Sequence, residues 1–206
     1  CLERLEPRML LAVNPLTEAE QQLHELINWV RANPLAASQH YGAALNAGLP
    51  AGTISSDPKP PLARNDLLRA AVEGHLEDMQ RNGFFSHTSS DGSQYTERIE
   101  AAHYTNWQRV GENLVWWGTT GALGDPLDVV EKLVESWFGS PGHRKNLMDP
   151  GFREAGSGFL AGPYTYNGVR YNAGLGGQDF GSRAGDYLLT GVGCTARQQA
   201  FAICDV

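Results

Sequence analysis

The spacing of apolar residues changes character at Pro150, and this change limits the possible folds more than any other feature of the sequence. Upstream, apolar side chains recur at helical intervals, as in residues 23–30. Downstream, glycine, aromatic and β-branched residues predict strands at 152–161, 169–180 and 187–192. Helices that come first and antiparallel strands that come last are typical of an α+β domain, in which helices pack on a sheet.

Short motifs predict where helices begin and end. Thr17-x-x-Glu20 has the spacing of a capping box, in which the hydroxyl and the carboxylate bind each other's backbone amides. Gly83 is placed to end a helix in the left-handed conformation. Asp125-Pro126 joins a cap residue to a proline at the first helical position, so a helix is expected to start there.

Turn and strand signals mark the rest of the chain. Asn167-Gly168 predicts a tight hairpin turn. Gly176-Gly177 indicates either a bulge or a close approach of another backbone to the strand. Residues 113–117 form a further short strand candidate.

Composition excludes several classes of protein. The chain has 206 residues, of which 41% are hydrophobic and 19% charged, which suits a packed core and not a disordered chain. The net charge of −7, without a cluster of Lys and Arg, argues against nucleic acid as a partner. Apolar runs of about five residues are far shorter than the ~20 that a transmembrane helix needs.

The six histidines separate into two groups. His24 and His40 are expected on the surface, His75 in the core with a hydrogen bond, and His103 at a helix end. His87 and His143 instead lie beside Ser and Gly residues that leave a ring accessible, and Glu112 lies between a turn glycine and an apolar strand. The sequence has no His-Glu-x-x-His motif, no Cys-x-x-Cys pair and no P-loop.

Four motifs in a fixed order carry a family resemblance. They are Gly83-Phe84-Phe85-Ser86-His87, Gly111-Glu112-Asn113-Leu114, Trp137-x-x-Ser140-Pro141-Gly142-His143-Arg144-x-Asn146-Leu147 and Phe152-Arg153-Glu154-x-Gly156-x-Gly158. Together with Gln178-Asp179-Phe180-Gly181, they resemble a bacterial CAP domain. This superfamily includes the cysteine-rich secretory proteins, antigen 5 and plant pathogenesis-related proteins. The resemblance covers residues 17–193.

The resemblance implies an α-β-α sandwich with a central antiparallel sheet and a shallow cleft holding two histidines and two glutamates. His87 and His143 match the two histidines, and Glu112 matches one glutamate. Ser140 occupies the usual position of the second glutamate, so the set of four is incomplete. Glu154 is either its substitute or a surface acid at a strand edge. Some family members bind zinc or another divalent ion through the histidine pair, which predicts a weak site at His87 and His143.

Three functions follow as alternatives. The first is a secreted or surface-exposed binding module for a lipid or another cell-envelope component. The second is a metal-assisted hydrolase, a peptidase for instance, with His87 and His143 on the metal and Glu112 as the base. The third is a structural module of a larger surface protein. The same three residues could also be purely structural, as a hydrogen-bonded His–Glu–His cluster that holds the helix starts to the sheet.

The ends of the chain add weaker signals. Residues 1–16 and 194–206 are expected to be tails around the domain at 17–193. Residues 5–12 resemble a LEPR-x-LL segment found near the N-termini of large exported bacterial proteins, which favours an extracellular or cell-surface location. Cys1 is either the lipid-modified first residue of a lipoprotein or an internal residue of a longer chain. Cys194 and Cys204 could close a small disulfide loop in an oxidising compartment.

Overall fold

A computed structural model describes residues 15–184. Its helices are α1 (Glu18–Ala32), α2 (Pro34–His40), α3 (Asp66–Asn82), α4 (Tyr95–Ala101), α5 (Pro126–Gly139) and α6 (Pro141–Leu147). Its strands are β1 (Ala63–Arg64), β2 (Trp107–Thr119), β3 (Glu154–Tyr166) and β4 (Val169–Arg183). The predicted strand at 187–192 and both predicted tails beyond these limits lie outside the described residues.

The strands form one sheet in the order β1-β3-β4-β2. β4 pairs antiparallel with β3, as the Asn167-Gly168 turn predicts, and on its other side it pairs antiparallel with β2. The two-residue β1 runs parallel to the start of β3, so the sheet is mixed and not wholly antiparallel. Such a short strand has no detectable apolar alternation, which is why sequence spacing did not predict it.

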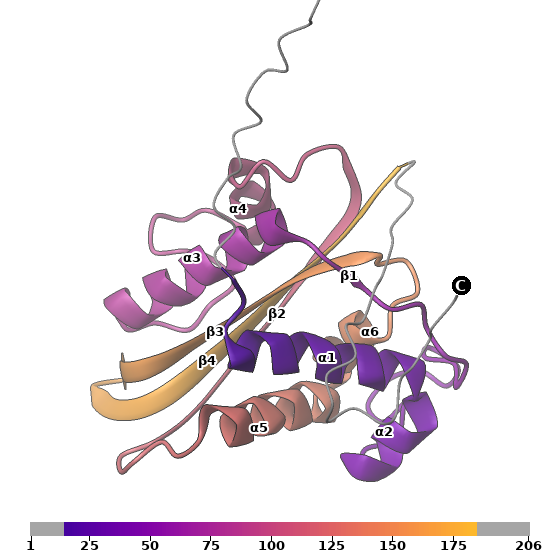
Figure 1. The fold of residues 1–206 in the computed structure, drawn as a ribbon, viewed down its shortest axis with the longest axis horizontal. Helices are drawn as coiled ribbons and strands as arrows, with labels where there is room; N and C mark the ends of the chain where they lie inside the picture. Colours follow the sequence, from indigo (N-terminus) through magenta and orange to yellow (C-terminus); the bar gives the residue numbers. More distant parts are fainter. Residues whose placement is uncertain (1–14, 185–206) are drawn as a thin grey trace, which may run out of the picture.

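Helices cover both faces of the sheet (Figure 1). α3 and α4 lie on one face, where Val72, Leu76 and Met79 of α3 pack against Leu114 and Leu175 of the sheet. α1 and α5 lie on the other face, where the second and larger part of the core includes residues of both helices and of β3 and β4. The α+β class and the α-β-α sandwich are therefore confirmed.

The predicted helix boundaries are confirmed by hydrogen bonds. Thr17 and Glu20 form the capping box at the start of α1. Gly83 ends α3 with φ at 69°, in the left-handed region. Asp125 accepts a hydrogen bond from the Leu127 amide at the start of α5.

The sheet confirms the turn signals and extends one strand. Asn167 (φ 49°) and Gly168 (φ 78°) form the two-residue turn between β3 and β4. The β3–β4 register is continuous through Gly177, and a Cβ placed there would lie 2.3 Å from Cγ2 of Val72. Neither alternative for this glycine pair holds as stated, because the strand has no bulge here and the close approach is made by helix side chains and not by backbone: Val72 of α3 at Gly177 and Leu133 of α5 at Gly176. β2 extends well beyond the predicted 113–117.

None of the helices within residues 15–184 combines the length and the apolar character needed to cross a bilayer.

Candidate functional site

His87 is held at the surface by the segment that follows α3. The Tyr164 hydroxyl donates to the Phe84 carbonyl at 2.6 Å, and the His75 ring nitrogen Nε2 lies 2.7 Å from the Ser86 carbonyl oxygen. Both bonds fix the backbone immediately before His87. The His87 side chain remains 54% exposed, so its ring is fixed at its base and open to solvent.

Glu112 on β2 is the buried partner of this ring. Its side chain is 1% exposed, and its Oε1 lies 2.7 Å from Nδ1 of His87. Its Oε2 accepts a hydrogen bond of 2.5 Å from Nη2 of Arg98. The ion pair with Arg98 compensates for burying the carboxylate. Because the ionised carboxylate can only accept, Nδ1 of His87 carries the proton and Nε2 is left with a lone pair.

Arg98 also connects the site to its surroundings. Its Nη1 donates to the carbonyl oxygen of His87 and to the hydroxyl of Ser89, each at 3.0 Å. One guanidinium of α4 therefore holds the Glu112 side chain and the His87 backbone at the same time. Sequence reasoning missed Arg98, although a cation near a buried acid is the expected partner.

His143 lies on α6, which packs against β2. Asn113 Nδ2 donates to the His143 carbonyl at 3.2 Å, and Asn146 Nδ2 donates to Oδ1 of Asn113 at 2.9 Å. Asn146 also donates to the Glu112 carbonyl at 3.3 Å, which ties α6 to the strand at the site itself. Burial is the main cause that lowers the pKa of His143, and a positive charge on His87, when that ring is protonated, lowers it further.

A fully buried arginine fixes the helix that carries His143. Arg144 donates through Nε to the Leu45 carbonyl at 2.9 Å and through Nη1 to the Phe138 carbonyl at 2.5 Å. A further bond reaches the Ala47 carbonyl. The segment between α2 and β1 is thereby attached to the helix that carries His143.

Ser140 and Glu154 have different surroundings from the other candidates. Ser140 joins α5 to α6, is half-buried and makes no side-chain cap hydrogen bond. Glu154 is only 3% exposed, so the interpretation as a surface acid is wrong. Its carboxylate accepts hydrogen bonds from Tyr104, Asn65 and Arg183, at distances between 2.6 and 3.2 Å. These hydrogen bonds connect β3 with β4 and with the segments that precede α3 and β2.

Asp179 is a second residue that sequence reasoning did not select for the site. It lies on β4 directly opposite Glu112 and is fully buried. In the described part of the chain, neither of its oxygens has a hydrogen-bond donor. Burial, and then the charge of Glu112, raise the pKa of Asp179 well above its ordinary value. The pairing register of β2 and β4 would have been needed to find it.

The remaining histidines mostly follow expectation. His75 is buried and hydrogen-bonded, and His40 and His103 are exposed. His24 is the exception, because its ring is half-buried and its Nε2 lies 3.1 Å from the Leu62 carbonyl oxygen. The polar side of α1 is covered here by the chain that leads into β1, and burial lowers the pKa of His24.

Comparison with known proteins agrees with this geometry. The family model described as CAP, the cysteine-rich secretory protein family, matches residues 24–172. The chain belongs to the CAP family. That match includes His87, Glu112 and His143, the residues that are expected to line a cleft.

Two Bacillus subtilis proteins resemble this CAP domain in sequence. The membrane protein YlbC is 33% identical over 97 residues, which cover 47% of this chain and 25% of YlbC. The protein YkwD is 28% identical over 101 residues, which cover 48% of this chain and 35% of YkwD. The matched regions therefore span about a quarter and about a third of these relatives.

Two solved structures share the fold. An extracellular SCP-domain protein of Bacillus anthracis has a TM-score of 0.52 at 22% identity, and the match covers 82% of this chain and 45% of that one. An outer surface protein of Borrelia burgdorferi has a TM-score of 0.55 at 16% identity. The match covers 82% of this chain and 96% of that one. At these identities the likeness concerns the fold.

The cleft offers an incomplete set of metal ligands. Within residues 15–184, no three His, Cys, Asp or Glu side chains are placed to hold one metal ion. Nδ1 of His87 is hydrogen-bonded to Glu112. This leaves Nε2 of His87 and the ring of His143 as the nitrogens that could bind a metal. Structural zinc sites use four protein ligands and catalytic ones commonly three. The described residues do not fit such a site.

Proposed function

We propose that this CAP domain is an extracellular ligand-binding module, and that His87 and His143 contact the ligand in the cleft. The observation that carries the proposal is the exposed His87 ring, whose Nδ1 is held by buried Glu112 while Nε2 faces outward. A fixed imidazole with one free nitrogen accepts a hydrogen bond from a polar ligand without losing rotamer freedom on binding.

The partners of His87 favour binding over hydrolysis. Nucleophilic catalysis by a serine or a cysteine requires that hydroxyl or thiol within reach of the base. The hydrogen bonds of the His87 ring and carbonyl go to a carboxylate and a guanidinium. The names of the structural neighbours, one extracellular and one at the outer surface, support a location outside the cell and a cell-envelope component as the ligand.

Co-sedimentation tests this proposal. Purified peptidoglycan and phosphatidylglycerol vesicles are used as separate probes for a wall or a lipid ligand. We expect the domain to pellet with one of them, and His87→Ala to weaken that binding about tenfold, the value of one good hydrogen bond to a fixed partner. His103→Ala is the matched control, since His103 is exposed and outside the cleft. Equal retention of wild type and His87→Ala would contradict the proposal, as would failure of both probes, which would favour a structural module.

The second candidate is a metal-assisted hydrolase. The observation in its favour is the pair of neighbouring imidazoles, one with a carboxylate on its other nitrogen, a pattern that orients metal-bound histidines. Zinc titration by calorimetry on wild type, His143→Ala and His103→Ala tests it. This candidate requires binding that His143→Ala abolishes, together with cleavage of a peptide library that a chelator removes and zinc restores.

A further inference from the structure

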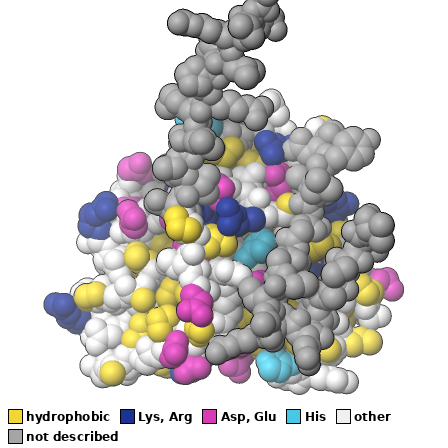
Figure 2. Space-filling model, in the orientation of Figure 1, with side chains coloured by type: hydrophobic (Ala, Val, Ile, Leu, Met, Phe, Trp, Pro, Cys, Tyr) yellow, Lys and Arg dark blue, Asp and Glu magenta, His cyan; other side chains and the backbone are white. Residues whose placement is uncertain are grey.

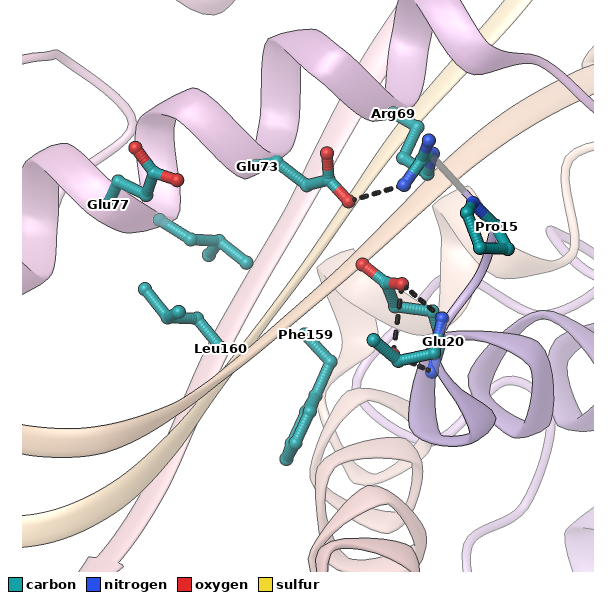
Figure 3. A pocket seen from close by; sticks show the side chains of 9 residues that line it. Pro15, Glu20, Arg69, Glu73, Glu77, Phe159 and Leu160 are labelled. Atoms are coloured by element: carbon teal, nitrogen blue, oxygen red, sulfur yellow. Dashed lines mark hydrogen bonds and ion pairs between the residues drawn. The ribbon is translucent and has the colours of Figure 1, made fainter. Parts of the chain in front are cut away.

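A pocket of about 250 Å³ lies away from the cleft, between the start of α1, the middle of α3 and β3 (Figure 3). β1 pairs with β3 only at Glu154 and Ala155, so the outer edge of β3 is not paired with β1 beyond them. Phe159 and Leu160 line the pocket on this part of β3. The start of α1 and the middle of α3, two helices from opposite faces of the sheet, therefore meet at one strand edge.

Two carboxyl groups face each other in this pocket, one from each helix (Figure 3). Oε2 of Glu20 accepts hydrogen bonds from the Thr17 amide at 2.8 Å and the Thr17 hydroxyl at 2.9 Å. Glu73 accepts one from Nη1 of Arg69 at 2.9 Å. The side chains of Glu20 and Glu73 are also hydrogen-bonded to each other. Because ionised carboxylates can only accept, this bond requires one proton between them.

Among the described residues, three arginines pair with the acids around this site, but only Arg69 contacts Glu73, because Arg64 pairs with Asp66 at 3.3 Å and Arg81 with Glu77 at 3.8 Å. Arg69 contacts Glu73 and, at 3.5 Å, also Asp66. Glu77 lines the pocket from α3 and adds negative charge, and β3 contributes apolar side chains. Burial, and then the hydrogen bond with Glu20, raise the pKa of Glu73 to about 7. Burial acts to raise the pKa of Glu20 as well, but the bonds from Glu73 and Thr17 outweigh it and lower that pKa.

We propose that Glu20 and Glu73 form a pH-sensitive latch, which holds the start of α1 to α3 across the edge of β3 while the two carboxyl groups share a proton. Loss of the proton leaves two like charges in contact, and the first turn of α1 separates from α3. Glu20 is also the acid of the α1 capping box, so repulsion at its side chain acts directly on the first turn.

The sign of the pH effect follows from the raised pKa of Glu73. The folded chain keeps a proton that the unfolded chain releases near pH 4.5. Its stabilising contribution is therefore complete below that value and is lost as the pH rises through about 7. Glu20, with a lowered pKa, acts in the opposite sense and loses its contribution only at acid pH.

Melting curves of wild type and Glu73→Gln test the latch. Glutamine keeps a donor for Glu20 and carries no charge, so it imitates the protonated state at every pH. We expect similar melting temperatures at pH 5, and at pH 8 a value about 3–6 °C higher for Glu73→Gln than for wild type. Glu77→Gln is the matched control from the same pocket, and its difference from wild type should not change with pH. A difference between Glu73→Gln and wild type that is the same at both pH values would overturn the proposal.

A measurement on the unaltered protein provides an independent check. Carbon NMR of the side-chain carboxyl groups should show one glutamate that titrates near pH 7 and shifts together with a second glutamate. Amide exchange in the first turn of α1, corrected for the intrinsic rate, should increase between pH 6 and 8. If all glutamates titrate near their ordinary value, the latch does not exist.

Discussion

The cleft depends on one buried carboxylate that serves two partners on different elements. Glu112 orients the ring of His87 and neutralises the guanidinium of Arg98, whose side chain is only 10% exposed. The sequence motifs predicted that Glu112 and His87 would lie together, because both belong to the motifs that resemble the CAP family. They did not predict Arg98 or Asp179, since those contacts depend on how α4 docks and on the register of β2 against β4.

Replacing Glu112 should destabilise the fold. Glu112→Ala leaves the Arg98 guanidinium buried without its carboxylate, so we expect a loss of about 2–4 kcal/mol in the free energy of unfolding. Urea denaturation measures it. Glu135→Ala, at an exposed position of α5, should stay within about 0.5 kcal/mol of wild type. A Glu112→Ala variant as stable as this control would show that the carboxylate is not needed for folding.

Contacts between α3 and the sheet set how closely the elements pack. Gly156 on β3 has no space for a side chain, because a Cβ there would lie 2.0 Å from the backbone nitrogen of Arg69. A backbone cannot move aside as the end of a flexible side chain can. The same helix carries His75, which holds the segment leading to His87, so the spacing of α3 from the sheet also positions the cleft.

Two glycine substitutions distinguish the effect of this close packing on stability from the effect of helix propensity. Gly156→Ala should lower the free energy of unfolding by about 2–3 kcal/mol, because α3 must shift. Gly74→Ala, in the exposed middle of α3 with no atom near its Cβ, should raise it by about 0.5–1 kcal/mol. Both are measured by urea denaturation. Equal effects of the two changes would mean that α3 does not pack as described.

The ends of helices and the hairpin turn were predictable from the sequence, whereas the limits of the strands were not. Thr17, Gly83 and Asn167-Gly168 act through hydrogen bonds and dihedral angles within a few residues, which a sequence displays directly. The length of β2 and the existence of β1 depend on pairing with β4 and β3, which come much later in the chain. Long-range pairing overrides local signals at such places.

Charge on the whole molecule is acidic and dispersed. On the face seen in Figure 2, Lys and Arg side chains are scattered among acidic and apolar ones. Three histidines, His24, His75 and His143, have lowered pKa values, with burial as the largest cause in each case. A lowered pKa means that each is neutral in the folded chain at a pH where the unfolded chain begins to take up protons.

Acid should therefore destabilise the fold through these histidines. Their contribution is complete above pH 6.5 and is lost as the pH falls through their folded pKa values. In Glu73→Gln, where the opposite effect of the latch is removed, the melting temperature should fall from pH 7 to pH 5. Adding His75→Gln, which retains a donor for the Ser86 carbonyl, should reduce that fall. An unchanged fall would assign the effect to the other two histidines.

Location can be tested on the native, full-length protein. The proposed function places it outside the cell or at its surface. Fractionation followed by protease treatment of intact cells should find the domain accessible or released. Recovery in the cytoplasm only would contradict the proposal.

The strand order has a consequence for synthesis. β4 lies between β3 and β2 in the sheet, yet it is the last strand in the described chain. Every helix described here leaves the ribosome before the strand on which the sheet depends. The β3–β4 hairpin can form quickly because its contacts are local, whereas β2 and β1 must wait for a partner made much later. The complete sheet can therefore form only once the chain as far as Arg183 has been made, and until then the apolar helix faces lack part of the surface that covers them.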